Sequence, residues 1–186
     1  MKKLNKAQYL TRTAMLLAVA VVFQNLRMLP ILASSTPQSL FVIGTLVNLV
    51  LVISVDFAGA WAAMFIGVCT PVIAWMQGHL AFEIMIPIVV AGNIVFSTLY
   101  FYIKDKNKYL GIIGGAIVKF VIFILTMPAL ISIFLFDKPE KVQSLIQYNF
   151  SWPQLVTALI GGFLAIIISS SVKLKINGEK SGENVE

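Results

Sequence analysis

The sequence is poor in charge, in cysteine and in histidine. Only 12% of its 186 residues are charged, against about 25% in soluble domains, so a soluble globular protein is disfavoured. The one cysteine, Cys69, excludes an intrachain disulfide framework, and we expect it to be a small packing residue in an apolar run. The chain has one histidine, His79, and one histidine is weak evidence for a metal centre, because such a site needs several ligands. We therefore predict no metal.

The motifs of common catalytic sites are also missing. The chain has no G-x-x-x-x-G-K-[ST] loop for a nucleotide, no H-E-x-x-H and no G-x-S-x-G. No acidic pair or nucleophile constellation stands out either. We therefore predict that the protein is not an enzyme and holds no cofactor, and a membrane-embedded enzyme is the least favoured of the functions considered.

Long apolar runs are what the sequence has in excess. Hydrophobic residues make up 59% of the chain, and they form runs of about 20 residues, the length that crosses about 30 Å of hydrocarbon. This pattern predicts an all-α integral membrane protein with six transmembrane helices. The predicted spans are 9–29, 39–55, 57–77, 82–103, 109–135 and 152–172. Residues 1–172 would form one membrane domain, and 173–186 a polar tail that we expect to be disordered.

The basic residues predict the orientation of these spans. With six spans both termini lie on one side, and most Lys and Arg residues of the short loops and tails lie on that side. The opposite side carries only Arg27, Lys138 and Lys141. Since positive charge favours the cytoplasmic side, both termini should be cytoplasmic. The same dispersed distribution argues against a nucleic-acid partner, which would require a basic patch.

Prolines and small residues divide the predicted helices into two halves. Pro71, Pro87 and Pro128 fall in the outer halves of their spans, where each would remove a helical hydrogen bond. Irregular backbone at membrane depth is tolerated where it lines a cavity, which predicts a pocket open to the outside; ordinary kinks without a pocket are the alternative. Ala14 and Ala18, one turn apart in the inner half of the first span, predict close helix packing inside the bundle or on a partner.

Lys119 is the ionisable residue nearest the middle of a span. A lysine there costs about 2.5–3.5 kcal/mol on insertion scales, so such residues are candidates for function. Its ammonium group could bind an anionic group of a ligand. It could equally pair with a polar residue such as Asn48 or Asn93.

Further polar and aromatic residues gather near the predicted outer ends. Trp75, Gln77 and Glu83 lie near His79, and Trp152 begins the last span. The tryptophans fit interfacial anchors or stacking faces for a flat ligand. Arg27, which follows Gln24 and Asn25, could reach lipid phosphates or hold a carboxylate. The predicted substrate-binding candidates are Arg27, Asn48, Trp75, Gln77, His79, Glu83, Asn93, Lys119 and Trp152.

Several stretches resemble one family of membrane proteins. The chain resembles the substrate-binding S components of energy-coupling factor (ECF) vitamin transporters. The resemblance lies in six spans, a basic N-terminus and the stretches "AMLLA" (Ala14 to Ala18), "GTLVNLVLVI" and "GVCTPVIAWMQG…IPIVVAGNIVF". The resemblance implies a multi-pass protein of a prokaryotic cell membrane that captures a vitamin or similar nutrient from outside. It also implies a transmembrane T component and two ATPase subunits as partners, with Ala14 and Ala18 packing on the T component.

A different class of protein has a similar length and helix count. Membrane scaffolds of the rod-shape-determining MreD type would need tight helix packing but no outward pocket. The outer prolines and Lys119 favour transport over this alternative.

Overall fold

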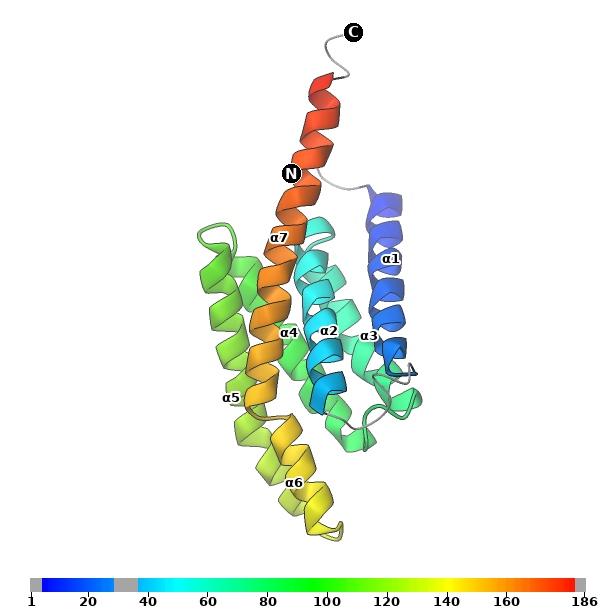
Figure 1. Cartoon of the computed structure of the whole chain (residues 1–186), viewed down its shortest axis with the longest axis vertical. Helices are drawn as coiled ribbons and strands as arrows, with labels where there is room; N and C mark the ends of the chain where they lie inside the picture. The colour runs from blue at the N-terminus through cyan, green and yellow to red at the C-terminus, as the bar shows by residue number, and fades with distance from the viewer. Residues whose placement is uncertain (1–4, 29–36, 183–186) are drawn as a thin grey trace.

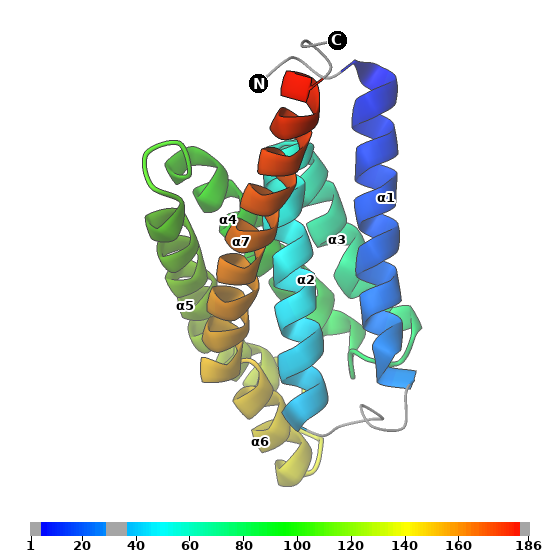
Figure 2. The same ribbon diagram turned by 45° about the horizontal axis from the view of Figure 1, so that its top comes forward.

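The protein is a bundle of long helices. The computed structural model describes residues 5–28 and 37–182, and the side chains of residues 5–27 and 39–172 within them. The helices are α1 (Lys6–Asn25), α2 (Pro37–Phe57), α3 (Ala60–Met76), α4 (Ile86–Ile103), α5 (Lys108–Phe134), α6 (Glu140–Asn149) and α7 (Trp152–Gly182), with short 3-10 turns at Leu26–Met28 and Glu83–Met85. The start of α1 and the end of α7 lie at one end of the bundle, and α6 lies at the other (Figures 1 and 2).

The prediction of an all-helical membrane protein is confirmed for the described residues, which contain no strand. Five helical segments are long and apolar enough to cross a membrane, and α3 is a shorter apolar helix. The six predicted spans therefore correspond to α1 through α5 and α7. The helix α6 lies between α5 and α7, in the loop 136–151, where Leu145, Ile146, Tyr148 and Phe150 among charged residues predict a short amphipathic piece. Its one buried residue, Ile146, packs into an apolar cluster with residues of α5.

Local sequence signals explain where several helices begin. At the start of α1, the Asn5 side chain accepts from the backbone N–H of Gln8 at 2.7 Å, and the Gln8 side chain accepts from the backbone N–H of Asn5 at 3.2 Å. This reciprocal capping satisfies donors that a helix end leaves free. Asn107 caps α5 in a similar way, because its side chain accepts from the N–H groups of Tyr109 and Leu110.

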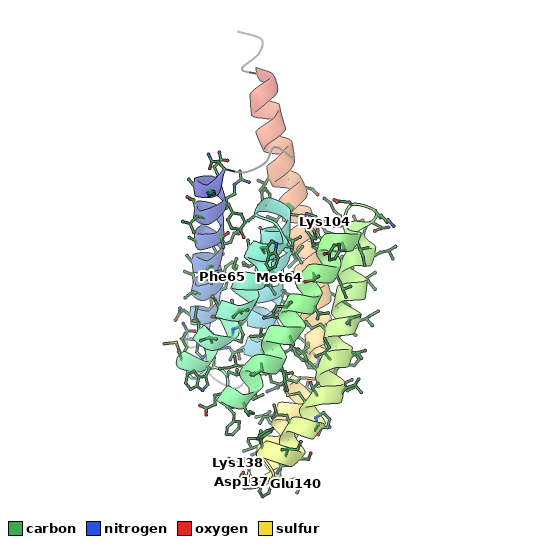
Figure 3. All side chains as sticks on the ribbon, turned by 180° about the vertical axis from the view of Figure 1, so that it is seen from behind. Met64, Phe65, Lys104, Asp137, Lys138 and Glu140 are labelled. Atoms are coloured by element: carbon green, nitrogen blue, oxygen red, sulfur yellow. The ribbon has the colours of Figure 1, made fainter. Side chains whose placement is uncertain are left out.

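The tight turn predicted near Asp56 is present between α2 and α3. Gly59 has φ +98°, a left-handed conformation that residues with a side chain rarely adopt. The buried carboxylate of Asp56 accepts from the Tyr100 hydroxyl at 3.3 Å and pairs with the Lys104 ammonium at 3.3 Å. These contacts tie the turn to the end of α4, at the end of the bundle opposite Asp137, Lys138 and Glu140 (Figure 3).

Small residues let the central helices approach closely. A Cβ atom at Gly161 of α7 would collide with the carbonyl oxygen of Thr45 in α2, and one at Gly115 of α5 would lie 2.9 Å from the Phe96 ring of α4. Half of the residues in the most apolar stretch of α2 are buried inside the bundle, against 17% of those in the corresponding stretch of α1. The core is therefore built around α2, and α1 packs at its periphery.

Two expectations about helix boundaries were wrong. Pro87 does not interrupt a helix, because it lies in the first turn of α4, where the missing N–H would have no helical acceptor. The predicted disordered tail also begins too early, since the backbone of α7 continues to Gly182. Pro71 and Pro128 do lie inside helices, α3 and α5, as predicted.

Candidate functional site

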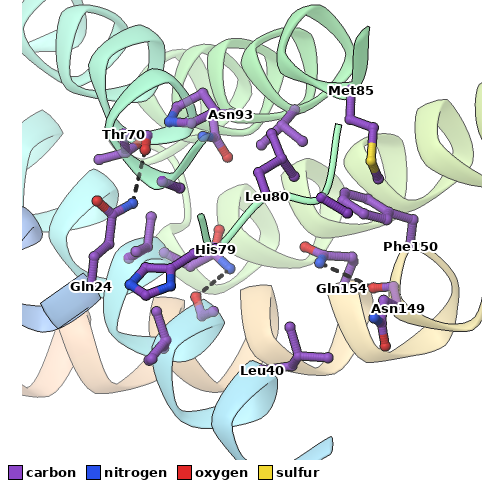
Figure 4. A pocket seen from close by; sticks show the side chains of 18 of the residues that line it. Gln24, Leu40, Thr70, His79, Leu80, Met85, Asn93, Asn149, Phe150 and Gln154 are labelled. Carbon is purple, nitrogen blue, oxygen red and sulfur yellow. Dashed lines mark hydrogen bonds between the residues drawn. The ribbon is translucent and has the colours of Figure 1, made fainter. Parts of the chain in front are cut away.

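A cavity of about 190 Å³ lies among α2, α3, α4, α5 and the corner between α6 and α7. It occupies the half of the bundle away from the ends of α1 and α7 that hold the termini. In Figure 4, Gln24, His79 and Asn93 are turned toward the same space from three separate segments. The polar lining residues are Gln24, Arg27, Asn48, Thr70, His79, Asn93, Lys119, Asn149 and Gln154.

A second hollow of about 320 Å³ adjoins this cavity. The two share Arg27, His79 and Asn149 among their lining residues. The second hollow also contacts Gly78 and Leu145, in the loop after α3 and in α6. The cavity therefore continues to the end of the bundle, with Arg27 and His79 at the junction.

Lys119 stands at the deep side of the cavity and is 3% exposed. Its ammonium donates to the side-chain oxygens of Asn48 at 2.8 Å and Asn93 at 2.9 Å. The rings of Phe96 and Phe123 lie 5.6 and 5.8 Å from the same nitrogen. Of the two roles considered for Lys119, pairing with Asn48 and Asn93 is the one seen here. An ammonium has three donors, so one N–H remains without an acceptor among the described residues.

The orientation of both amide groups follows from a second set of hydrogen bonds. Asn48 donates its Nδ2 to the carbonyl of Gly44 at 2.8 Å, and Asn93 donates its Nδ2 to the carbonyl of Gly67 at 3.2 Å. Gly67 lies four residues before Pro71, which has no N–H to offer that carbonyl. Asn93 therefore replaces the hydrogen bond that Pro71 removes, and in doing so turns its oxygen toward Lys119.

Gln24 joins α1 to the same region of α3. Its Nε2 donates to the carbonyl of Thr70 at 2.9 Å, and the residue is 4% exposed. Because the amide nitrogen is held by a carbonyl, the amide oxygen of Gln24 is the atom left without a partner. A helix at the edge of the bundle thus contributes a buried acceptor to the cavity.

Unpartnered polar atoms concentrate in the cavity. Among the described residues, eight buried side-chain nitrogen or oxygen atoms have no hydrogen-bond partner, and five belong to residues that line this space. These five are Gln24 Oε1, Arg27 Nε, Thr70 Oγ1, His79 Nε2 and Asn149 Oδ1. Each such group costs about 1–3 kcal/mol when it is buried unsatisfied. A bound polar molecule would satisfy them together.

The charge in the cavity is positive. Arg27 and Lys119 line it, and none of its described lining residues is acidic. The Nη1 of Arg27 donates to the carbonyl of His79 at 3.1 Å. Burial, and then the charge of Arg27, lower the pKa of His79 below its ordinary value. The imidazole is therefore neutral at pH 7 and adds no charge of its own.

The structure brings together five of the nine predicted substrate-binding residues: Arg27, Asn48, His79, Asn93 and Lys119. The other four do not line the cavity. Trp75 is 40% exposed on α3, and Trp152 is 47% exposed and packs on the rings of Phe41 and Tyr148. Gln77 donates to the side chain of Asn25 at 3.3 Å. Glu83 is exposed in the turn before α4.

Four further polar residues of the cavity were not among the predicted set: Gln24, Thr70, Asn149 and Gln154. In the sequence, Gln24 stands out only as a polar neighbour of Arg27. Thr70 precedes Pro71, and a polar residue beside a predicted kink was the available signal for it. Asn149 and Gln154 flank the corner between α6 and α7, which no periodic pattern in the sequence located.

Ala14 and Ala18 face away from the bundle. Both are exposed on α1, whereas Thr13 and Ala20 are the residues buried on its inner side. The alternative that this alanine pair serves internal packing is therefore wrong. The pair remains available to lipid or to a partner.

The chain was compared with known families and proteins. Residues 8–172 match the model of one family, described as ECF transporter, substrate-specific component. Neither the curated proteins nor the solved structures gave a match. The match includes α2 to α5 in full, most of α1 and α7, and every residue that lines the cavity. The chain therefore belongs to the family of substrate-specific components of ECF transporters.

Proposed function

We propose that this chain is the substrate-capture subunit of an ECF-type ABC importer in a prokaryotic cell membrane. It binds a vitamin or related small nutrient from outside and delivers it inward together with a transmembrane T component and two ATPase subunits. The chain itself is not an enzyme, and ATP hydrolysis belongs to the partners. The family match supports the role of a substrate-specific component.

One observation carries the proposal: five unpartnered buried polar atoms belong to residues that line one cavity. Structural cavities in membrane bundles are apolar or have their polar groups satisfied, because hydrocarbon offers no substitute partner. A set of unsatisfied groups around one space is the arrangement expected of a binding site. A scaffold of the MreD type would have no use for these groups.

The exposed alanine pair supports the assembly with a T component. Ala14 and Ala18 leave a shallow strip on the outer face of α1 between larger exposed side chains such as Met15 and Val19. Small residues at this spacing let a second helix approach closely in a bilayer. The strip lies in the half of α1 nearer the chain terminus, so a partner docked there leaves the cavity open.

The proposal is tested by identifying what the purified protein holds. The protein is produced in cells grown in rich medium, purified in detergent and denatured, and the released small molecules are identified by mass spectrometry. We expect one nutrient-sized compound in molar proportion to the protein, and we expect it to raise the thermal unfolding temperature when added back. A protein that releases no such compound, and that no vitamin stabilises, would favour the scaffold.

A further inference from the structure

We propose that the substrate is a small aliphatic carboxylic acid that also carries hydroxyl or amide N–H groups, and that its carboxylate binds Arg27. This inference rests on the proposed function, since it names the class of molecule captured by the cavity. Three features of the cavity lead to it: its charge, the kind of unpartnered atoms and the chemistry of its walls.

The charge of the cavity calls for an anion. Within the described part of the chain, the carboxylates found in ion pairs are Asp56, which pairs with Lys104, and Asp137, which pairs with Lys138. Neither lines the cavity, so Arg27 and Lys119 face it without a counter-ion. A buried cation without a partner is costly, and an anionic ligand offsets that cost.

Arg27 rather than Lys119 is the carboxylate anchor. Lys119 already spends two of its three donors on Asn48 and Asn93. Among the described residues, Arg27 makes one hydrogen bond, to the His79 carbonyl, and its Nε has no acceptor. A guanidinium offers five donors in a planar fork that matches the two oxygens of a carboxylate. Arg27 also lines both the cavity and the second hollow, so it lies where the two meet.

The remaining unpartnered atoms call for hydrogen-bond donors on the substrate. The free atom of the Gln24 amide is its oxygen, because the nitrogen is held by the Thr70 carbonyl. An amide oxygen accepts only, so its partner must be an O–H or N–H group. The Oγ1 of Thr70 also has no partner, and a hydroxyl can either donate or accept. The substrate therefore carries hydroxyl or amide groups in addition to its carboxylate.

The walls favour an aliphatic body over a flat aromatic one. The apolar lining residues are aliphatic except for Phe150, and they include Ile43, Val47, Leu80 and Met85. The Phe150 ring is itself packed edge-on against Phe123, at 5.4 Å between centroids and 84° between planes. The imidazole of His79 is the one other aromatic ring among the described lining residues. Its Nε2 has no partner, so we assign this ring to hydrogen bonding with the substrate and not to stacking. The cavity of about 190 Å³ continues into the second hollow of about 320 Å³, so the lining residues, and not the volume, indicate the class of substrate.

The first arm of the test compares what different variants retain. Wild-type protein, Arg27→Gln, Arg27→Lys and Lys141→Gln are purified from rich medium, and their bound molecules are identified by mass spectrometry. Lys141 is an exposed cation of α6 outside the cavity and serves as the control. We expect wild type and Lys141→Gln to release the same aliphatic acid, Arg27→Gln to retain at least about tenfold less, and Arg27→Lys to retain an intermediate amount.

The second arm uses defined probes and calorimetric titration. Pantothenate is an aliphatic hydroxy-amide acid, and panthenol is the same molecule with an alcohol in place of the carboxylate. Thiamine provides a cation and riboflavin a flat three-ring body. We expect the acid extracted in the first arm to bind at least about tenfold more tightly than its uncharged counterpart, and we expect thiamine and riboflavin not to bind. Gel-filtration profiles confirm that each variant is folded.

The outcomes separate this inference from the proposed function. Release of a cation, a flat aromatic molecule or any compound without a carboxylate would overturn the assigned class and leave the proposed function standing. The same holds if Arg27→Gln retains the acid at the wild-type level. If no molecule is released and none of the four probes binds, both the proposed function and the assigned class are overturned.

Discussion

Lys119 illustrates how a costly residue is accommodated inside this bundle. A lysine at mid-membrane is expensive, and here two asparagine oxygens from α2 and α4 meet its ammonium at 2.8 and 2.9 Å. The asparagines are oriented by carbonyls of Gly44 and Gly67. The helices α2, α3, α4 and α5 are thus linked by hydrogen bonds around one cation.

Replacing Lys119 is expected to reduce both stability and binding. In Lys119→Met the side chain keeps its length, but the oxygens of Asn48 and Asn93 lose their donor. We expect destabilisation of about 1–3 kcal/mol, because buried acceptors are then unsatisfied. The thermal unfolding temperature in detergent measures this, with exposed Lys141→Met as the control. Equal unfolding temperatures for Lys119→Met and wild type would contradict the role assigned to this network.

The lowered pKa of His79 predicts a pH dependence of stability. Burial and the charge of Arg27 disfavour the protonated form in the folded protein, so the unfolded chain takes up the proton first as the pH falls. Stability due to His79 is therefore fully present above its unfolded pKa of about 6.5 and is lost as the pH falls below that value. Unfolding temperatures between pH 8 and pH 5 should fall more steeply for wild type than for His79→Gln. Parallel profiles would show that His79 does not contribute.

At the scale of whole elements, α2 and α7 depend on one glycine. A Cβ atom at Gly161 would meet the Thr45 carbonyl oxygen and would lie 2.9 Å from the Leu49 nitrogen, both rigid backbone atoms of α2. Gly114 in α5 is different, because the nearest atom to its Cβ would be Ile103 Cδ1 at 3.9 Å. The two glycines therefore form a matched pair.

We expect Gly161→Ala to lower the unfolding temperature and Gly114→Ala to leave it unchanged or to raise it slightly. The first forces two helices apart, whereas the second removes a helix-destabilising glycine at no steric cost. Thermal unfolding of both purified variants in one detergent checks the prediction. A tolerant Gly161→Ala would show that α2 and α7 are packed less closely than described.

The outer face of α1 predicts a separation of binding from uptake. Ala14 and Ala18 are exposed and lie far along α1 from Gln24, so a larger side chain there should leave the cavity intact. We expect Ala14→Trp and Ala18→Trp to retain the co-purified molecule and to lose most nutrient uptake in cells, because the helix of a partner could no longer approach. Ile133→Trp, at an exposed position of α5 outside the cavity, is the control. Loss of ligand binding alongside normal complex assembly would count against this role.

For the whole molecule, the distribution of basic residues predicts which end faces the cytoplasm. Lys106 lies in the loop between α4 and α5, and Lys141 lies in α6 at the opposite end. With Cys69 replaced by Ala, single cysteines at these two positions should react differently with a membrane-impermeant maleimide in intact cells. We expect Lys141→Cys to be labelled and Lys106→Cys to be protected. The reverse pattern would place the cavity on the cytoplasmic side.

Much of the fold was predictable because its signals are local. The apolar runs located six helices, since the length that crosses hydrocarbon is a property of each segment alone. Pro71 and Pro128 were placed inside helices correctly. Pro87 was not, because only the structure shows that α4 begins at Ile86, after an irregular turn. The additional helix α6 has a polar composition that hydropathy does not report.

The residues of the candidate site were likewise predictable where the signal is local and not where it depends on how the helices pack. Cations and amides in apolar runs are conspicuous in the sequence, so Arg27, Asn48, Asn93 and Lys119 could be named as candidates. Trp75 and Trp152 are candidates in the sequence for their ring faces, yet both lie outside the cavity, because the face that a residue presents depends on how its helix is rotated against its neighbours.

The sequence by itself determined that this protein is a multi-helix membrane bundle with cations at unusual depth, because hydropathy and charge act on each segment separately. Only the tertiary structure decided that the amide of Asn93 would donate to the carbonyl freed by Pro71, and that Gln24, at the cavity, would keep a buried oxygen without a partner. Both hydrogen-bond arrangements depend on how closely helices that are far apart in the chain approach and how they are rotated. Close contacts such as that of Gly161 with Thr45 set this distance and rotation when the bundle assembles.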